Sequence, residues 1–219
     1  MQMGVAQETD TTSHVVVKKI VIHQEKQEGL ALGIDLAPFI LQWMDPARKG
    51  LNFTGRINFK ENWFGVAELG YENFNFKSDR FNYLSNGTAI KFGADYDVYN
   101  PDEKGNKDNI FFGLRYGFAW QNQSSSAYTI ENNYWNNTSG SISPYSLNTH
   151  FAELLFGVRT EVVKNFFMGF SLRVKGIIHS SNTGILEPTS IPGYGVPNPI
   201  NFGFSYNLEY QIPYLWKKK

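Results

Sequence analysis

The sequence predicts an all-β protein, a closed barrel of eight antiparallel strands that crosses a membrane. Three observations lead to this prediction: a two-residue alternation of apolar and polar side chains, an alternation of short and long connections, and a non-aromatic face that carries glycine and charge. The alternation is clearest in residues 202–216, where every second residue from Phe202 to Trp216 is large and apolar or aromatic. This run is about three times the usual strand length in a water-soluble sheet.

Seven further segments share the two-residue alternation and complete the predicted set of strands. In the first of them, Leu30, Leu32 and Ile34 face one side, and Ala31, Gly33 and Asp35 face the other. The seven segments are, in chain order, residues 29–36, 51–60, 63–72, 88–99, 110–121, 151–162 and 166–178.

The connections between these segments alternate in length. Residues 60–62 and 163–165 are tight turns, and residues 100–109 form a compact polar turn. The remaining connections are predicted to be long loops, at residues 38–50, 73–87, 122–150 and 179–201. Such an alternation collects the turns at one end of a barrel and the loops at the other, which is typical of outer-membrane barrels.

The two faces of the strands favour a membrane over water. On the segment 110–121, one face is formed by Phe112, Leu114, Tyr116, Phe118 and Trp120, and the other by Gly113, Arg115, Gly117 and Ala119. The alternative is a lipocalin-like barrel in water, with its rings inside. Eight strands of rings would overfill that interior, and glycine suits a crowded lumen better than a solvent face.

The composition excludes several functional classes. The 219 residues include 20 Lys and Arg against 20 Asp and Glu, with no basic stripe, so nucleic-acid binding is not expected. There is no cysteine, which excludes disulfides, a thiol nucleophile and a cysteine metal site. No apolar run approaches the roughly 18 residues of a membrane-spanning helix. We expect neither a cofactor nor a metal ion.

Charged residues recur in the inward phase of the strands, with nearly balanced signs. Buried ions are costly unless they are paired, so we expect an ion-pair network that plugs the lumen. An ion or proton pathway along these groups is the functional alternative. The predicted lumen residues are Asp35, Arg56, Glu68, Glu72, Lys91, Asp95, Asp97, Arg115, Glu153, Arg159, Glu161, Arg173, Lys175 and Glu209.

Aromatic residues fall near the turn end of the strands, where they predict a girdle at the periplasmic interface. This set consists of Trp63, Tyr96, Tyr99, Phe166, Tyr214 and Trp216. The barrel is expected to span residues 29–216, followed by a basic tail at 217–219 in water. Residues 1–28 are expected to form a periplasmic segment. Its residues 1–6 either are a signal-peptide remnant, as the small-x-small pattern at 4–6 indicates, or belong to an ordinary flexible terminus.

Two groups of loop residues are candidates for chemistry or binding. His150, His179 and Ser180 fall at the loop ends of their strands and are candidate catalytic residues, although Ser–His chemistry needs a geometry that sequence does not supply. Plain loop polarity is the alternative. Candidate partner-binding residues in the third and fourth loops are Tyr128, Tyr134, Trp135, Tyr145, Ile191 and Tyr194. The alternative for these is a self-packed cap over the barrel mouth.

Several segments resemble, in order, a family of small outer-membrane β-barrels from Bacteroidetes with OmpA/OmpX-like architecture. They are GLALGIDLAPFI, AELGYENF, AIKFGADYDVY, FFGLRYGFAW, HFAELLFGVRTEVVKNFFMGFSLRVKG and IPGY, with the closing aromatic strand. The resemblance covers residues 29–216. It implies an outer membrane, with loops outside the cell and termini in the periplasm, but no activity, since the function of that family is undefined.

From these features we expect a non-enzymatic scaffold or accessory subunit of a cell-envelope complex. Its partners would be outer-membrane lipid, lipopolysaccharide and another outer-membrane protein or lipoprotein. A lipid-modifying enzyme of the lipid A deacylase or acyltransferase type is the rival hypothesis, and a narrow channel is the third.

Overall fold

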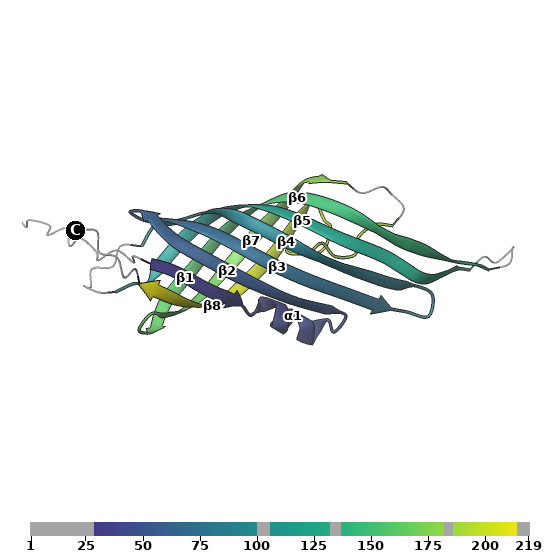
Figure 1. The fold of residues 1–219 in the computed structure, drawn as a ribbon, viewed down its shortest axis with the longest axis horizontal. Helices are drawn as coiled ribbons and strands as arrows, with labels where there is room; N and C mark the ends of the chain where they lie inside the picture. Colours follow the sequence, from purple (N-terminus) through teal and green to yellow (C-terminus); the bar gives the residue numbers. More distant parts are fainter. Residues whose placement is uncertain (1–28, 100–105, 132–136, 182–185, 214–219) are drawn as a thin grey trace, which may run out of the picture.

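The computed structural model describes residues 29–99, 106–131, 137–181 and 186–213, and Figure 1 shows their arrangement. Eight strands and one helix occupy this part of the chain. They are β1 (Gly29–Asp35), α1 (Ala37–Met44), β2 (Arg48–Lys60), β3 (Trp63–Lys77), β4 (Asn82–Asp97), β5 (Asn109–Ile130), β6 (Thr138–Val163), β7 (Phe166–Ser180) and β8 (Ile200–Pro213).

The eight strands form a closed ring, in which each strand pairs with the next along the chain and β1 pairs with β8. All pairs are antiparallel, and the closing pair runs from Gly29 opposite Pro213 to Asp35 opposite Asn207. The predicted all-β class and the eight antiparallel strands are therefore confirmed for the described part of the chain. Closure pairs the two strands that would otherwise be sheet edges.

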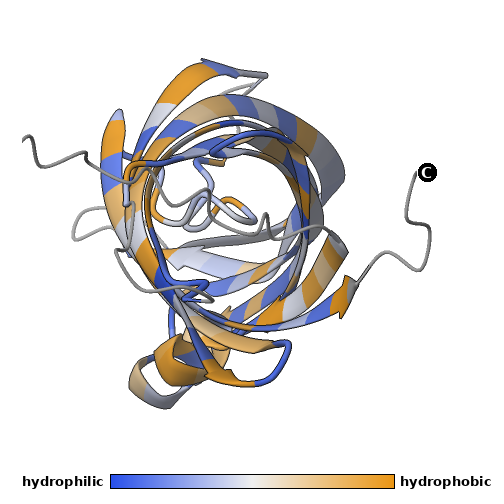
Figure 2. Ribbon diagram, turned by 90° about the vertical axis from the view of Figure 1, so that its left-hand side faces the viewer, coloured by the Kyte–Doolittle hydropathy of each residue, from blue (hydrophilic) through white to orange (hydrophobic). Residues whose placement is uncertain are grey.

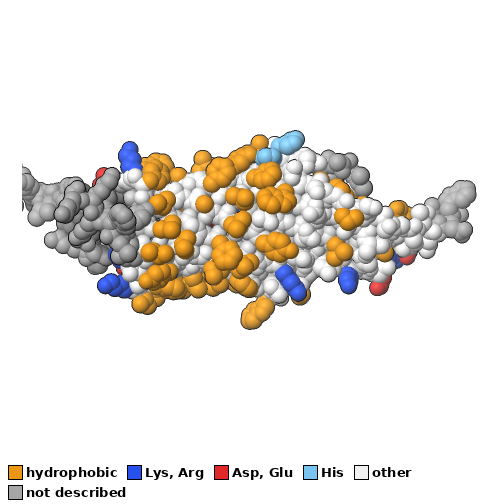
Figure 3. Space-filling view, viewed as in Figure 1, with side chains coloured by type: hydrophobic (Ala, Val, Ile, Leu, Met, Phe, Trp, Pro, Cys, Tyr) orange, Lys and Arg blue, Asp and Glu red, His pale blue; other side chains and the backbone are white. Residues whose placement is uncertain are grey.

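Side chains alternate between the two faces of the ring, with apolar groups outside and charges inside. On β5, Phe112 and Leu114 are 54% and 58% exposed, whereas Arg115 is 2% exposed. In Figure 3 the outward apolar side chains gather over the half of the body that carries the turns. Among the residues described, no helix is long and apolar enough to cross a membrane.

The turns lie at one end of the ring, as the sequence predicts. Asn62 and Asn165 sit in the two tightest turns with φ of 60° and 65°. These values are left-handed, and asparagine tolerates this region better than most residues because its side chain can hydrogen-bond locally. The opposite end carries α1 and the connections β3–β4, β5–β6 and β7–β8.

Two of the four predicted long loops, at 73–87 and 122–150, are largely wrong, because the strands continue through them, whereas the predicted loop at 179–201 is confirmed between β7 and β8. β3 runs to Lys77 and β4 starts at Asn82, so little of residues 73–87 is loop, and β5 and β6 likewise fill most of 122–150. The outward face of these extensions is mostly polar, so the outward apolar alternation by which the strands were predicted stops there. The first loop holds α1, with Pro38 in its first turn, where proline is tolerated.

Inward glycines let a side chain or the backbone of the next strand approach closely in the narrow interior. A Cβ at Gly117 would lie 2.3 Å from the ring of Phe151, and one at Gly93 would lie 1.9 Å from the carbonyl oxygen of Leu114. Because these contacts are far inside van der Waals distance, only glycine fits without a shift of the wall.

Changing Gly117 to alanine should destabilise the ring, since the new methyl group collides with Phe151. We expect a loss of about 1–3 kcal/mol in the free energy of unfolding, the usual cost of overpacking. Denaturant titration of the refolded protein measures it. Gly176→Ala is the matched control, because a Cβ there meets only the oxygen of Pro199, at 3.8 Å. Equal stability of the two variants would contradict the packing argument.

Candidate functional site

The interior of the ring holds a first group of ion pairs, here called the central cluster (Glu68, Lys91, Glu153, Arg173 and Lys175). Arg173 lies 2.8 Å from Glu68 and 3.0 Å from Glu153, and Lys91 lies 2.9 Å from Glu68 and 3.4 Å from Glu153. Lys175 is more distant, at 3.9 Å from Glu153. These side chains come from four strands on different sides of the ring, so the cluster crosses the lumen.

A second group, the turn-side cluster, consists of Arg56, Asp95, Arg159 and Glu209. Arg56 lies 3.0 Å from Asp95 and 3.8 Å from Glu209, and Arg159 lies 2.7 Å from Glu209. Arg115 joins the two clusters, at 2.7 Å from Asp95 and 3.4 Å from Glu68. Together with Arg115, the two clusters contain six cations and four carboxylates, so cations are in excess.

Aromatic rings that the sequence analysis did not single out flank the turn-side cations. The guanidinium of Arg159 lies 3.6 Å from the ring centre of Phe167, and that of Arg56 lies 4.7 Å from Phe111 and 5.7 Å from Phe64. Such contacts stabilise a desolvated cation. The sequence could have revealed these rings, because each of the three phenylalanines shares the inward phase of its strand with the charged residues.

Four predicted lumen residues lie outside the two clusters. Asp35 accepts hydrogen bonds from the backbone of Ala37 and Tyr206 and from Asn52. The other three lie near the strand ends, where Glu72 pairs with Arg48 at 3.7 Å, Asp97 accepts from Asn109 and the backbone of Tyr99, and Glu161 pairs with Lys107 at 2.8 Å.

The β7–β8 connection folds back into the ring, where it forms what we call the plug segment (residues 186–199). Its Ile191 and Tyr194 are 1% exposed and pack with Ala89, Ala119 and Phe151. Figure 2, which looks through the ring, shows this segment inside it. The predicted loop is thus a cap over the lumen, the alternative that the sequence left open.

Hydrogen bonds from the wall hold the plug segment. Tyr145 and Gln123 both donate to the carbonyl oxygen of Leu186, each at 2.7 Å. Tyr83 accepts from the backbone N–H of Thr189 at 3.2 Å and donates to Gln123 at 2.8 Å. Burial raises the pKa of Tyr83, so its hydroxyl remains a donor at neutral pH.

The predicted partner-binding residues therefore separate into three groups. Ile191 and Tyr194 are buried in the plug segment, so the prediction that they contact a partner is wrong. Burial of their side chains removes them from any partner. Tyr145 lies on β6, and its hydroxyl donates a hydrogen bond to the plug segment. Tyr128 lies near the tip of β5, where it pairs with Gly140. Tyr134 and Trp135 lie outside the described residues.

The structure does not assemble His150, His179 and Ser180 into a catalytic group. The two histidines are opposite each other on the outer face, with ring centres 6.2 Å apart, and His150 Nδ1 lies 2.6 Å from the hydroxyl of Tyr116. Ser180 points to the other face, where its hydroxyl lies 3.2 Å from Thr149. Alternation along β7 separates Ser180 from His179. In the described part of the chain, no three His, Asp or Glu side chains are grouped to hold a metal ion.

The described aromatics of the predicted girdle lie at the turn end. Trp63 and Tyr96 are cross-strand neighbours with ring centres 5.0 Å apart, and both are about two-fifths exposed, at 39% and 40%. Tyr99 is 37% exposed, and Phe166 is half-buried opposite Tyr210. Tyr214, Trp216 and the tail 217–219 lie outside the described residues, as does the segment 1–28.

Changing Glu153 to glutamine should destabilise the protein strongly, because Arg173, Lys91 and Lys175 all lose a carboxylate partner. Breaking a buried ion pair on one side costs about 3–5 kcal/mol. The free energy of unfolding from denaturant titration measures the loss. Glu61→Gln in the exposed β2–β3 turn is the control and should change stability by less than about 0.5 kcal/mol. Similar values for both variants would show that the central cluster contributes little.

Comparison with known proteins identifies a family without a known activity. A family model described as a domain of unknown function, DUF6048, matches residues 1–218. No curated protein matches the chain. Because the match extends over nearly all of the sequence, the chain belongs to the DUF6048 family.

Proposed function

We propose that the protein is an outer-membrane β-barrel that acts as a non-enzymatic scaffold or accessory subunit of a cell-envelope complex. The observation that carries the membrane placement is the reversed polarity of the ring, with exposed rings and aliphatic side chains outside and paired charges inside. In water, an apolar belt of this extent would be far larger than the patches that monomeric proteins tolerate. Lipid is the solvent that suits it.

The orientation follows from the two ends of the ring. Tight turns, the start of β1 and the end of β8 share one end, and Trp63 and Tyr96 mark the border of the apolar belt there. In outer-membrane barrels this end faces the periplasm. The resemblance of the sequence to small barrels of Bacteroidetes supports the same location.

The contents of the lumen argue against a channel. Buried ion pairs cross it, and the plug segment lies above them, with Ile191 and Tyr194 in van der Waals contact with the wall. Eight strands also leave no room for a wide aqueous pore. A binding role is therefore preferred over conduction.

The β5–β6 hairpin is the part of the barrel best placed to meet a partner. β5 and β6 are the longest strands, with 22 and 26 residues, and they project past the others in Figure 1. Ile130 near the tip is 60% exposed, beyond the apolar belt. A long, partly apolar hairpin outside the membrane suits contact with another envelope protein.

Arginine in place of Leu114 tests the membrane placement. In phospholipid vesicles it should lower the free energy of unfolding by about 2–4 kcal/mol, the cost of a charge on the lipid face near the midplane. Ile130→Arg is matched in exposure, at 60% against 58%, but lies beyond the belt and should be nearly neutral. If Leu114→Arg is equally neutral, its side chain faces water and the placement is wrong.

Affinity purification from the native host in mild detergent tests the accessory role. Mass spectrometry should find one or more envelope proteins in stoichiometric amounts. A variant in which residues 126–141 are replaced by an Asn-Gly turn should lose these proteins, because the tip of the hairpin is removed. The shortened hairpin can still close, since Ser125 and Ile142 are already paired across it. Lys164→Gln at the opposite end should keep the bound proteins. Recovery of the barrel alone would exclude a stable complex.

A further inference from the structure

The wall of the ring has a gap between β8 and β2. β1 pairs with both strands only as far as Asp35, which lies opposite Asn207 of β8 and Asn52 of β2. β8 begins at Ile200 and β2 at Arg48, so residues 200–205 of β8 and 48–51 of β2 have no β1 ladder between them. The backbone N–H of Leu36 donates to Tyr206, and there the chain leaves the wall and enters α1.

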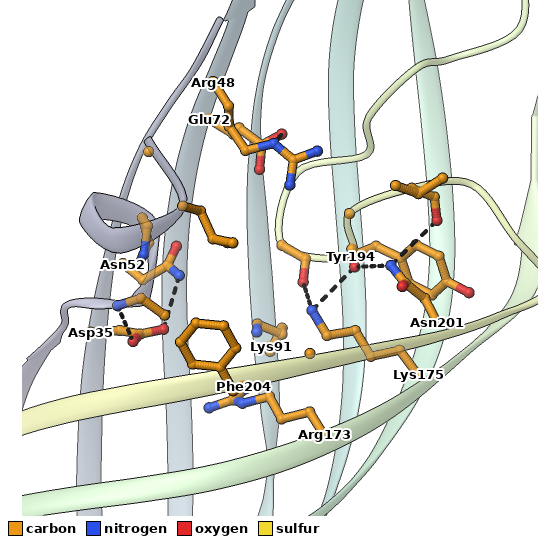
Figure 4. A pocket seen from close by; sticks show the side chains of 18 of the residues that line it. Asp35, Arg48, Asn52, Glu72, Lys91, Arg173, Lys175, Tyr194, Asn201 and Phe204 are labelled. Carbon is orange, nitrogen blue, oxygen red and sulfur yellow. Dashed lines mark hydrogen bonds and ion pairs between the residues drawn. The ribbon is translucent and has the colours of Figure 1, made fainter. Parts of the chain in front are cut away.

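A cavity of about 220 Å³ lies at this gap. Its lining includes the inward side chains of Lys91, Arg173 and Lys175, and also the outward residues Phe202 and Tyr71, which are 76% and 51% exposed. Residues from both faces of the wall therefore line this cavity. Figure 4 shows the inner part, where Lys175, Arg173 and Lys91 come together below Arg48 and Glu72.

The inner part of the cavity favours an anion. The charged side chains that line it are Asp35, Arg48, Glu72, Lys91, Arg173 and Lys175. Both carboxylates are occupied: Asp35 accepts two backbone N–H groups, and Glu72 is bonded to Ser190 and paired with Arg48. Lys175 instead donates to two neutral carbonyl oxygens, of Gly193 at 2.8 Å and Tyr194 at 3.1 Å, with its carboxylate partner 3.9 Å away.

The outer part of the cavity favours a hydrocarbon chain. Leu41 and Pro38 of α1 line one side, and Phe202 and Phe204 of β8 line the other. α1 lies against the outside of the ring (Figure 1), with Phe39, Ile40 and Met44 exposed at 47%, 44% and 80%. From this rim a chain would continue directly onto the apolar belt.

We propose that this gap is a lateral binding site for an amphiphile with an anionic head group and a hydrocarbon tail. The head group pairs with Lys175 inside the wall, and the tail leaves between α1 and β8 along the apolar exterior. A free fatty acid and an anionic phospholipid share this chemistry. The inference rests on the membrane placement proposed above but not on the proposed partner.

The test is a titration of the folded full-length chain in detergent, with native mass spectrometry to count bound molecules. The probes are oleate and phosphatidylglycerol, compared with oleyl alcohol, which has the tail without the charge, and inorganic phosphate, which has a charge without the tail. One oleate or one phosphatidylglycerol should bind per barrel, at least tenfold more tightly than either comparison probe. Oleate alone would identify a fatty acid as the ligand, and phosphatidylglycerol alone a membrane lipid.

Two variants separate the head-group contact from the tail contact. Lys175→Met removes the charge and should weaken binding at least tenfold. Leu41→Asp places a charge at the rim and should also weaken binding, while α1 stays outside the ring, so this variant carries the test if Lys175→Met does not fold. Gln42→Asp adds the same charge to the same helix at a position that does not line the cavity, and should bind as the wild type does.

The inference is overturned if the wild type binds neither amphiphile, or if oleyl alcohol binds as well as oleate. Unchanged binding by both Lys175→Met and Leu41→Asp would overturn it as well. The membrane placement is tested separately. The same preparation is inserted into phospholipid vesicles, and the free energy of unfolding of the wild type is compared with that of Leu114→Arg. A chain that inserts but binds no amphiphile refutes only the lateral site.

Discussion

The pairing of β1 with β8 is the contact on which the rest of the structure depends. Over Gly29–Asp35 the first strand completes the hydrogen bonds of both β2 and β8, and the sheet closes on itself. Over this length, closure removes the sheet edges and encloses an interior in which charged groups have little access to water. Most charges that point inward then pair with a counter-charge inside the ring, as Arg173 of β7 does with Glu68 of β3.

The shortness of the same strand produces the most suggestive feature of the surface. β1 has 7 residues against 13 in β2 and 14 in β8, so the ring is closed at the turn end and incompletely laddered at the other. Asp35 determines the point of departure by bonding the backbone of Ala37 and Tyr206 together with Asn52. The residue that ends the closing ladder therefore also borders the proposed lateral site.

The interior combines three ways of filling a narrow space with polar groups. Ion pairs satisfy most of the charges, inward rings such as Phe167 and Phe111 cover the guanidinium planes, and the plug segment seals the end away from the turns. Gly117 makes the last of these feasible, because the ring of Phe151 that supports Tyr194 occupies the space where a side chain would be. A charged lumen and a packed apolar cap thus coexist in one interior.

The sequence by itself determined the strands of the apolar belt, their phase and their turns, because a two-residue period and a short polar turn are local properties of the chain. It also placed Arg115, Glu153 and Arg173 on the inner face. Only the tertiary structure decided which charges pair, since partners such as Glu68 and Arg173 are set by the register of the closed ring. The same holds for the strand extensions, whose outward face is mostly polar, and for the plug segment, whose Ile191 and Tyr194 are indistinguishable in sequence from exposed loop residues until the ring surrounds them.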